Sequence, residues 1–268
     1  MIQFLVQMNS WRLWRFQVGV AGHRFRPPTL DRLVALALFR LGLMGRDEFA
    51  LFRSLLRPGM TVVDVGANQG VFTLFCADLV GSTGTVIAFE PDPEMFLTLE
   101  ANAKASAKTG IELHNLALGS EDGQLTFHIS RLNRGDNRLL ATRQPSGPND
   151  PTVRVVALDH MLNGRRVDLV KMDVQGWEGA VLRGMKDVLG SASPPWVHLE
   201  ICPHILAKAG SSFEEIHATF QRYGYALCQA NVRQAPLDLR KVAKLKGALG
   251  YVNALAVPAQ RLGHNARA

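Results

Sequence analysis

VVDVGANQG, residues 62–70, begins as a run of apolar, mostly β-branched residues and breaks into glycines directly after an acid. Such a run predicts a buried strand, and glycines in the following turn let the backbone bend tightly and approach a ligand closely. The acid, Asp64, precedes Gly66, Asn68 and Gly70. A carboxylate here disfavours a bound pyrophosphate, which requires a helix N-terminus without a nearby anion. The turn therefore suits a ligand with an ammonium group, and its amides suit the carboxylate of an amino-acid group.

A second acid stands at the end of the next predicted strand, TVIAFEPD, residues 85–92. Glu90 comes 20 residues after Gly70 and is followed by Pro91. That position is typical of a carboxylate that accepts both hydroxyls of a ribose. A ligand with an amino-acid end, a ribose and no phosphate is S-adenosylmethionine. Two plainer interpretations stay open, a helix cap for Asp64 and a solvated strand end for Glu90, but two acids on consecutive strand ends are more specific than either alone.

Strands and helices alternate from residue 60 onward, which predicts an α/β fold with a mostly parallel sheet and helices on both faces. The ligand should then sit beyond the carboxyl ends of the strands. GQLTFHIS alternates in polarity and is expected to add an antiparallel strand, and YALCQ and YVNALAVP are expected to form a closing hairpin. The other expected strands are TVVDVG, TVIAFEPD, IELHNLAL, VRVVAL, VDLVKMDV and WVHLEI. The helices expected between them are VFTLFCADLV, PEMFLTLEANAKAS, DHMLNG, GWEGAVLRGMKDVL and a helix near residues 212–223.

A helical segment over residues 1–58, called the lead-in below, is expected before this domain. RPPTLDRLVALALFRLG predicts a helix that starts after Thr29 as N-cap and ends near Gly42, and DEFALFRSLL predicts a second helix. We expect three parts: a basic helical segment over residues 1–58, the α/β domain over 59–260 and a tail over 261–268.

The basic character of the chain belongs to this lead-in. The net charge is +7, and residues 1–60 hold nine arginines and three acidic residues. This charge fits an anionic membrane surface, an anionic substrate, nucleic acid or a solvated helical face. Trp11, Trp14 and Phe16 stand among the arginines, which suits a peripheral membrane contact. No nucleic-acid-binding module accompanies them, so no nucleic-acid partner is expected.

The start of the chain is apolar and then basic, which is the reverse of a secretory signal, and no apolar run reaches the roughly 18 residues of a membrane span. The sequence therefore predicts an intracellular, cytoplasmic protein, with membrane association left open. Cys76, Cys202 and Cys228 are far apart, which favours reduced, buried thiols over a zinc site or disulfides.

Four stretches of the chain occur in a fixed order: DVGANQGVFTLFCA, VIAFEPDPEMFLTLEANAK, NLALGSEDG and DLVKMDVQGWEGAVLRGM. Together they resemble the FkbM family of S-adenosylmethionine-dependent methyltransferases. The resemblance covers roughly residues 45–205, and the fourth stretch is its most specific part. It implies a class I methyltransferase fold, a Rossmann-like three-layer sandwich with a seven-stranded sheet, and O-methylation of sugars or natural-product hydroxyls.

The resemblance also implies which residues contact the cofactor. Asn115 and Ala117, near the end of the third strand, are weaker candidates for the edge of the adenine. The other implied contacts are Asp64, Gly66, Asn68, Gly70 and Glu90, with Pro91 beside them.

The fourth stretch contains the candidate catalytic residues. Asp173 ends the strand that faces the sulfonium in such folds and is the first candidate for a base, a metal ligand or a hydrogen-bond acceptor for the substrate. Lys171 lies two residues earlier and so points to the same side of the strand. Glu178 begins the next helix, where it could join Asp173 or complement the helix dipole. The family usually has an acid where this chain has Gln175, which cannot hold a charge, so a divalent metal is not favoured and we predict no metal ligands.

Further candidates lie on the next strand and in a long loop. Glu200 ends WVHLEI and could reach the substrate. His198, on the same face, is more typical of a core residue, and His204 on the following loop is a weaker candidate for the base. Trp177 is more typical of a core wall than of a stacking platform.

The polar segment 131–151 is long enough to be a functional loop. We expect it to fold over the pocket as a lid, with Asp136, Asn137 and Arg138 as its contacts. A solvated arginine-rich loop is the alternative.

The motifs favour a methyltransferase acting on a small molecule, a glycan or a lipid-linked glycan. Alternatives are a methyltransferase for protein or nucleic acid, a dehydrogenase-like binding domain and a membrane-peripheral protein without catalysis. The loop reads GxxxG rather than GxGxxG, which counts against the dehydrogenase. The acceptor and the oligomeric state do not follow from the sequence.

Overall fold

A seven-stranded sheet organises the protein, which we describe from a computed structural model covering residues 17–128, 138–139, 150–242, 244–245 and 250–262. The strand order is β12-β13-β11-β10-β3-β4-β5, and within this sheet every strand is parallel to β3 except β13. The expected mostly parallel sheet with a C-terminal antiparallel hairpin is therefore confirmed. Its strands are β3 (Thr61–Val65), β4 (Thr85–Phe89), β5 (Ile111–His114), β10 (Leu169–Met172), β11 (Trp196–Ile201), β12 (Tyr225–Gln229) and β13 (Val252–Pro258).

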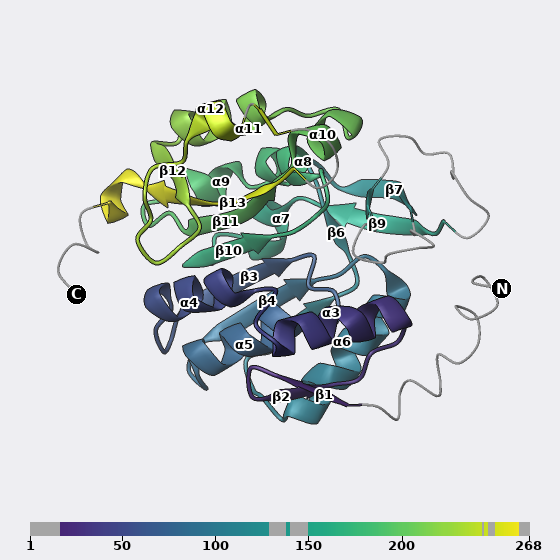
Figure 1. Ribbon diagram of the computed structural model, residues 1–268. Coiled ribbons are helices and arrows are strands. Elements are labelled where there is room, and N and C mark those ends of the chain that lie inside the picture. The colour runs from purple at the N-terminus through teal and green to yellow at the C-terminus, as the bar shows by residue number, and fades with distance from the viewer. Residues whose placement is uncertain (1–16, 129–137, 140–149, 243, 246–249, 263–268) are drawn as a thin grey trace.

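Helices cover both faces of this sheet (Figure 1). Successive strand residues point to opposite faces, so Val62 and Val63 enter different cores. The core beneath Val62 is closed by α3, α4, α5 and α6, and that beneath Val63 by the later helices. Because both faces are covered, the strands read as continuous apolar runs. The helices are α3 (Leu30–Arg40), α4 (Arg46–Leu55), α5 (Val71–Val80), α6 (Pro93–Ser106), α7 (Leu158–Leu162), α8 (Glu178–Arg183), α9 (Lys186–Leu189), α10 (Pro203–Lys208), α11 (Phe213–Arg222), α12 (Leu239–Val242) and the short 3₁₀ helix η2 (Ala259–Arg261).

The lead-in contains a hairpin that the sequence pattern did not predict. Strands β1 (Val18–Val20) and β2 (His23–Phe25) pair through a turn at Ala21 and Gly22, both with positive φ. The N-terminal segment therefore contains this hairpin in addition to the expected helices. Strands this short carry almost no periodicity, so their pairing depends on packing against α3 and α6. The two predicted helices are present, and Thr29 is the N-cap of α3 as expected.

A small second sheet lies beside the end of the main one. Its order is β6-β9-β7-β8, from β6 (Ala117–Leu118), β7 (Gly123–His128), β8 (Arg138–Leu139) and β9 (Thr152–Val156). β7 is antiparallel to β9, which confirms the expected extra strand. The expected strand IELHNLAL is instead split into β5 and β6, which belong to different sheets.

The helix expected over residues 176–189 is also divided, into α8 and α9. Gly184 separates them and packs against the backbone of Gly119, where any side chain would overlap the Gly119 carbonyl. Close contact with the second sheet therefore interrupts the helix, which its own sequence does not indicate.

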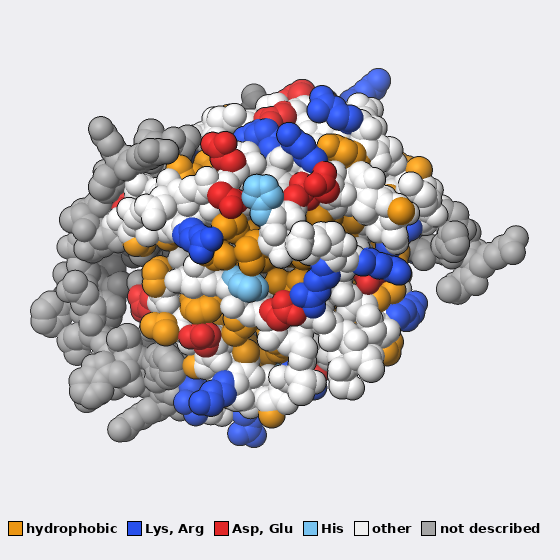
Figure 2. Space-filling view, turned by 180° about the vertical axis from the view of Figure 1, so that it is seen from behind, with side chains coloured by type: hydrophobic (Ala, Val, Ile, Leu, Met, Phe, Trp, Pro, Cys, Tyr) orange, Lys and Arg blue, Asp and Glu red, His pale blue; other side chains and the backbone are white. Residues whose placement is uncertain are grey.

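Charged side chains of both signs are interspersed on the face shown in Figure 2, with apolar groups between them. Among the residues that the structure describes, no helix is both long and apolar enough to cross a membrane. Cys76, Cys202 and Cys228 are free and buried, as the sequence predicted.

Candidate functional site

Asp64 and Lys171 form a buried ion pair at the centre of the sheet. They are in register on β3 and β10, and Lys171 Nζ lies 3.1 Å from Asp64 Oδ1. Thr73 on α5 donates a hydrogen bond of 2.6 Å to Asp64 Oδ2, and Lys171 donates one of 3.1 Å to the carbonyl of Gly66. Asp64 is 1% exposed and Lys171 4%. Asp64 thus lies on the sheet side of the glycine turn, and its ion-pair partner Lys171 positions the turn through the Gly66 carbonyl.

The charge of Lys171 is held by its neighbours. Burial alone would lower the pKa of Lys171, but the carboxylates of Asp64 and Asp173 raise it above its ordinary value. His198 is in register with Lys171 on β11 and packs edge-on against Phe52. Burial, with the charge of Lys171, lowers the pKa of His198 to about 3. His198 is therefore a neutral core residue.

The glycine turn contacts the next strand end on its other side. Gly66, Asn68 and Gly70 all have positive φ, which favours glycine and, less strongly, asparagine. A side chain at Gly66 would overlap the carbonyl oxygen of Asp173. Asn68 donates its backbone N–H to Glu90 Oε2 at 2.7 Å. The turn is therefore held between the ends of β4 and β10, and a residue larger than glycine does not fit at position 66.

Glu90, Pro91 and Asn115 lie together at the end of β4. Glu90 is buried, accepts the N–H of Asp92 at 2.9 Å as well as that of Asn68, and has its pKa raised to about 8 by burial. Asn115 is exposed and donates to the carbonyls of Glu90, at 2.8 Å, and of Pro91. Ala117 is separated from this group, because it is buried in β6 and pairs with Val155.

A cluster of carboxyl groups occupies the ends of β10 and β11. Asp173 is half-buried, and its Oδ1 accepts a hydrogen bond of 2.8 Å from Gln175. Glu178 is 2% exposed, and burial raises its pKa to about 7. Burial, followed by the charges of Asp173, Glu178 and Glu48, raises the pKa of Glu200 to about 8. The predicted catalytic acids are thus gathered in one place, and Gln175 orients Asp173.

Glu48 belongs to this cluster and was missed by sequence reasoning. It is half-buried on α4, and its pKa is raised chiefly by burial. Its Oε1 accepts a hydrogen bond of 2.6 Å from Asn253, which lies opposite Glu200 on β13. In the sequence Glu48 reads as an ordinary acid in the first turn of a helix, and no local signal links it to residues so far along the chain.

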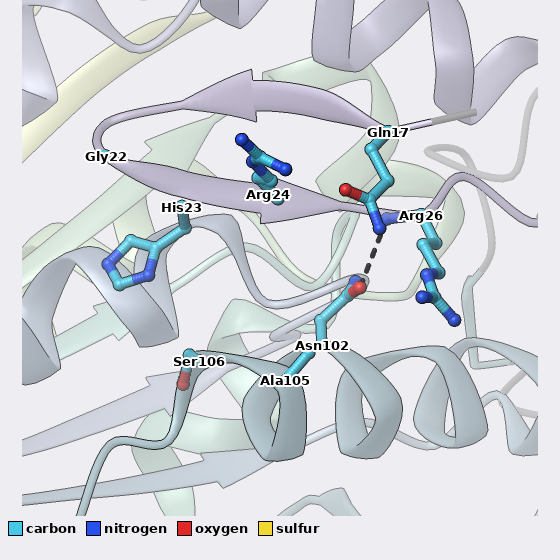
Figure 3. A pocket seen from close by; sticks show the side chains of 8 residues that line it. All are labelled: Gln17, Gly22, His23, Arg24, Arg26, Asn102, Ala105 and Ser106. Carbon is cyan, nitrogen blue, oxygen red and sulfur yellow. Dashed lines mark hydrogen bonds between the residues drawn. The ribbon is translucent and has the colours of Figure 1, made fainter. Parts of the chain in front are cut away.

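The lead-in also reaches the glycine turn. Arg32 on α3 lies with Nη1 3.4 Å from Asn68 Oδ1. The N–H of Arg26 donates to Asn102 Oδ1 at 3.2 Å (Figure 3), and Asn102 Nδ2 donates to the Gln69 carbonyl at 2.9 Å. A cavity of about 440 Å³ lies beside this contact, between the β1–β2 hairpin and α6, and none of the predicted site residues lines it.

The remaining candidates fall elsewhere. His204 is exposed on α10, and half-buried Trp177 packs against the core. Asp136 and Asn137, with most of the expected lid, lie outside the described residues, and Arg138 belongs to β8. Within the described part of the chain, no group of three or more His, Cys, Asp or Glu residues is arranged to hold a metal ion.

Residues 64–227, which span the glycine turn and the carboxyl cluster, match the family model of the methyltransferase FkbM domain. The chain belongs to the FkbM methyltransferase family. It is a methyltransferase that depends on S-adenosylmethionine.

Three curated relatives are similar over about half to two-thirds of the chain. Methyltransferase 1 of Beauveria bassiana is 28% identical over 67% of this chain and 77% of its own length. The hexuronic acid methyltransferase AglP of Haloferax volcanii is 30% identical over 48% of this chain and 52% of its own length. The 31-O-demethyl-FK506 methyltransferase FkbM of Streptomyces tacrolimicus is 32% identical over 49% of this chain and 62% of its own length. The chain thus spans about half to three-quarters of the length of these relatives.

Solved structures of other methyltransferases are similar at a greater distance. A precorrin-6y C5,15-methyltransferase from Geobacter metallireducens aligns with a TM-score of 0.44 and 10% identity, over 80% of this chain and 87% of that one. Fibrillarin from Aeropyrum pernix aligns with a TM-score of 0.42 and 14% identity, over 78% of this chain and 73% of that one.

Proposed function

We propose that the protein methylates a hydroxyl group of a sugar, a glycan or a polyhydroxylated natural product. The observation that supports this most directly is the pair of half-buried carboxyl groups, Glu200 and Glu48, that lie near each other beside Asp173. Carboxylates accept hydrogen bonds from hydroxyl groups, and two of them near one position suit an acceptor with more than one hydroxyl. Two relatives are named as methyltransferases of hexuronic acid and of 31-O-demethyl-FK506, in line with this class of acceptor.

The cofactor is proposed to lie across the ends of β3 and β4. Glu90 would accept the ribose hydroxyls, Pro91 and Asn115 would border the adenine, and the glycine turn would face the methionine end. Because Asp64 is already paired with Lys171, we assign both to positioning and propose Asp173 as the carboxylate facing the ammonium. When bound, S-adenosylmethionine supplies an electrophilic methyl group on a sulfonium.

Glu200 is proposed as the base that takes the proton of the acceptor hydroxyl. It is half-buried, unlike Glu178, so an acceptor can reach it. With its pKa near 8, the carboxylate holds a proton more readily than an exposed glutamate does, which matches the demand on a general base near neutral pH. Asn253 holds Glu48 opposite, where it would orient a second hydroxyl.

A panel of uronic acids, glycans and 31-O-demethyl-FK506, assayed with labelled methyl donor with and without a chelator, tests the proposal. We expect methyl transfer to at least one hydroxyl and a loss of about 10²- to 10⁴-fold in kcat for Glu200→Gln. Binding of S-adenosylhomocysteine should stay within about twofold. Glu214→Gln, an exposed change on α11, is the control. Transfer only to protein or RNA would overturn the proposal.

A contact with an anionic membrane surface is the second proposal, and the exposed face of α3 favours it. Leu30, Val34 and Leu41 share this face and are exposed, as are Leu43 and Met44 just beyond it. Exposed Arg24, Arg26 and Arg46 belong to the same lead-in, and apolar side chains bordered by arginines suit an interface with anionic lipid. Flotation with phosphatidylserine vesicles at low salt should recover the protein, and Leu30→Ser/Val34→Ser should abolish this. Equal recovery with neutral vesicles, or none with either, would contradict the proposal.

A further inference from the structure

The cavity between the β1–β2 hairpin and α6 plays no part in the function proposed above. Its volume of about 440 Å³ is within the usual range of small-molecule sites. The hairpin forms one wall, and the last turns of α6 form the other (Figure 3). Three bases, His23, Arg24 and Arg26, line it from the hairpin side, and none of its described lining residues is acidic. The charges that line the cavity are therefore all of one sign.

Arg24 and Arg26 are directed to the same side of the hairpin. They are two residues apart, one in β2 and one directly after it, and both are exposed, whereas Phe25 between them is buried. Arg40, at the end of α3, reaches this side as well. Its Nη1 lies 3.1 Å from the position that a Cβ of Gly19 would occupy, and Gly19 is the cross-strand partner of Arg24. Because cross-strand partners share a face, three arginine side chains gather at this hairpin, and the first two line the cavity.

Within the described part of the chain, no carboxylate pairs with these three arginines. None of the ion pairs found there involves any of them. His23 is held by Asp78, with Nε2 2.7 Å from Oδ2, and the same carboxylate also pairs with Lys108. Walls that carry one sign of charge attract ligands of the opposite sign, so the cavity suits an anion.

The two arginines of the cavity favour a phosphate over a carboxylate. A guanidinium binds either group through two parallel hydrogen bonds. A carboxylate offers one negative charge, whereas a phosphate monoester carries about −1.5 to −2 at neutral pH and has three acceptor oxygens. It can therefore engage two guanidiniums at once. On the opposite wall, the side chains of Asn102 and Ser106 already hydrogen-bond to backbone groups, so they shape the cavity while the arginines recognise the ligand.

We propose that the cavity binds a phosphate monoester through Arg24 and Arg26, carried either by a soluble molecule or by a lipid headgroup. The cavity is larger than a phosphate ion, which leaves room for the group that carries the phosphate. The inference does not rest on the methyl acceptor proposed above, so each can fail without the other.

Calorimetry with glucose 6-phosphate tests the soluble source, with glucose as the blank. Arg24→Gln and Arg26→Gln should each weaken binding of the phosphate ester by about 10- to 100-fold, as expected for loss of a hydrogen bond between charged groups. Arg24→Lys keeps the charge without the bidentate geometry and should lose less. Arg46→Gln, an exposed change of equal charge outside the cavity, should stay within about twofold.

Flotation tests the lipid source. Vesicles with phosphatidic acid present a phosphate monoester, and vesicles with phosphatidylglycerol, matched for charge, present only a diester. A headgroup site should recover more protein with phosphatidic acid, and Arg24→Gln/Arg26→Gln should abolish that difference. Either positive result supports the inference if these variants remove it and Arg46→Gln does not. No binding of glucose 6-phosphate together with equal recovery from both vesicles would overturn it, as would an equal loss in Arg46→Gln.

Discussion

At the scale of single residues, the buried pair of Asp64 and Lys171 governs the site. Both side chains are almost fully removed from water, and this is costly unless the two charges compensate each other. The pair also holds the glycine turn, since Lys171 donates to the carbonyl of Gly66. A contact that stabilises the sheet is thus the same contact that shapes the cofactor turn.

Removing one partner of this pair should destabilise the protein strongly. Lys171→Met leaves the Asp64 carboxylate buried without its cation, so we expect the free energy of unfolding in urea to fall by about 3–5 kcal/mol. The double variant Asp64→Asn/Lys171→Met leaves no unpaired charge and should lose less than the sum of the two single variants. Strictly additive losses would show that the pair is not coupled.

The buried carboxyl groups predict how stability depends on pH. Folding raises the pKa of Glu178 from 4.5 to about 7, and those of Glu200 and Glu90 from 4.5 to about 8. Between these values the folded state binds more protons at these groups than the unfolded state, so their contribution to stability is fully present below about pH 4.5 and is lost as the pH rises to about 8. In urea titrations, Glu178→Gln and Glu200→Gln should each make this decline shallower. A slope that neither substitution alters would contradict the assignment.

At the scale of elements, the lead-in is part of the site. The β1–β2 hairpin reaches the glycine turn through Asn102, α3 reaches it through Arg32, and α4 supplies Glu48 to the carboxyl cluster. The sheet supplies the turn and most of the acids, while these elements close the site from outside.

Asn102 should therefore couple the hairpin to cofactor binding. Asn102→Ala leaves the N–H of Arg26 and the carbonyl of Gln69 without their partner, which should cost about 1–3 kcal/mol in unfolding free energy. Because Gln69 lies in the glycine turn, affinity for S-adenosylhomocysteine should fall as well. Ser106→Ala, one turn further along α6, is the matched control. A destabilised variant with unchanged affinity would separate the hairpin from the site.

At the scale of the whole molecule, the lead-in and the sheet share one core. Leu36, Leu51, Phe52 and Leu55 of α3 and α4 are almost fully buried and belong to the cluster that packs under Val62. Burying each such side chain contributes about 1.5–3 kcal/mol, so their sum is comparable with the whole stability of a typical domain. We therefore propose that residues 1–58 and 59–260 fold as one unit.

Truncation tests this unity. Deletion of residues 1–58 should yield a chain without cooperative thermal unfolding or near-ultraviolet circular dichroism, because the apolar surface that α3 and α4 cover would be exposed. Deletion of residues 1–16 should leave both intact. A cooperative fold in the 59–268 fragment would show that the lead-in is a separate domain.

Much of this architecture follows from local patterns in the sequence. Runs such as VVDV and the glycines after them carry the strand and turn signal within a few residues, so the order of elements could be predicted. Because parallel strands bring their carboxyl ends to one edge, the position of Glu90, Asp173 and Glu200 along that edge could be predicted too. The sequence alone thus determined the sheet, the turn and the class of cofactor.

Only the tertiary structure decided which charged groups are buried and which meet at the site. The pairing of Asp64 with Lys171 depends on strand register. The positions of Glu48 next to the carboxyl cluster and of Arg32 next to the glycine turn depend on how the lead-in packs against the sheet. These contacts join residues that are distant in sequence, and their energies come from burial and charge compensation that exist only once the core has formed. No pattern within one segment carries that information, because the partner that determines each side chain's role lies in another segment.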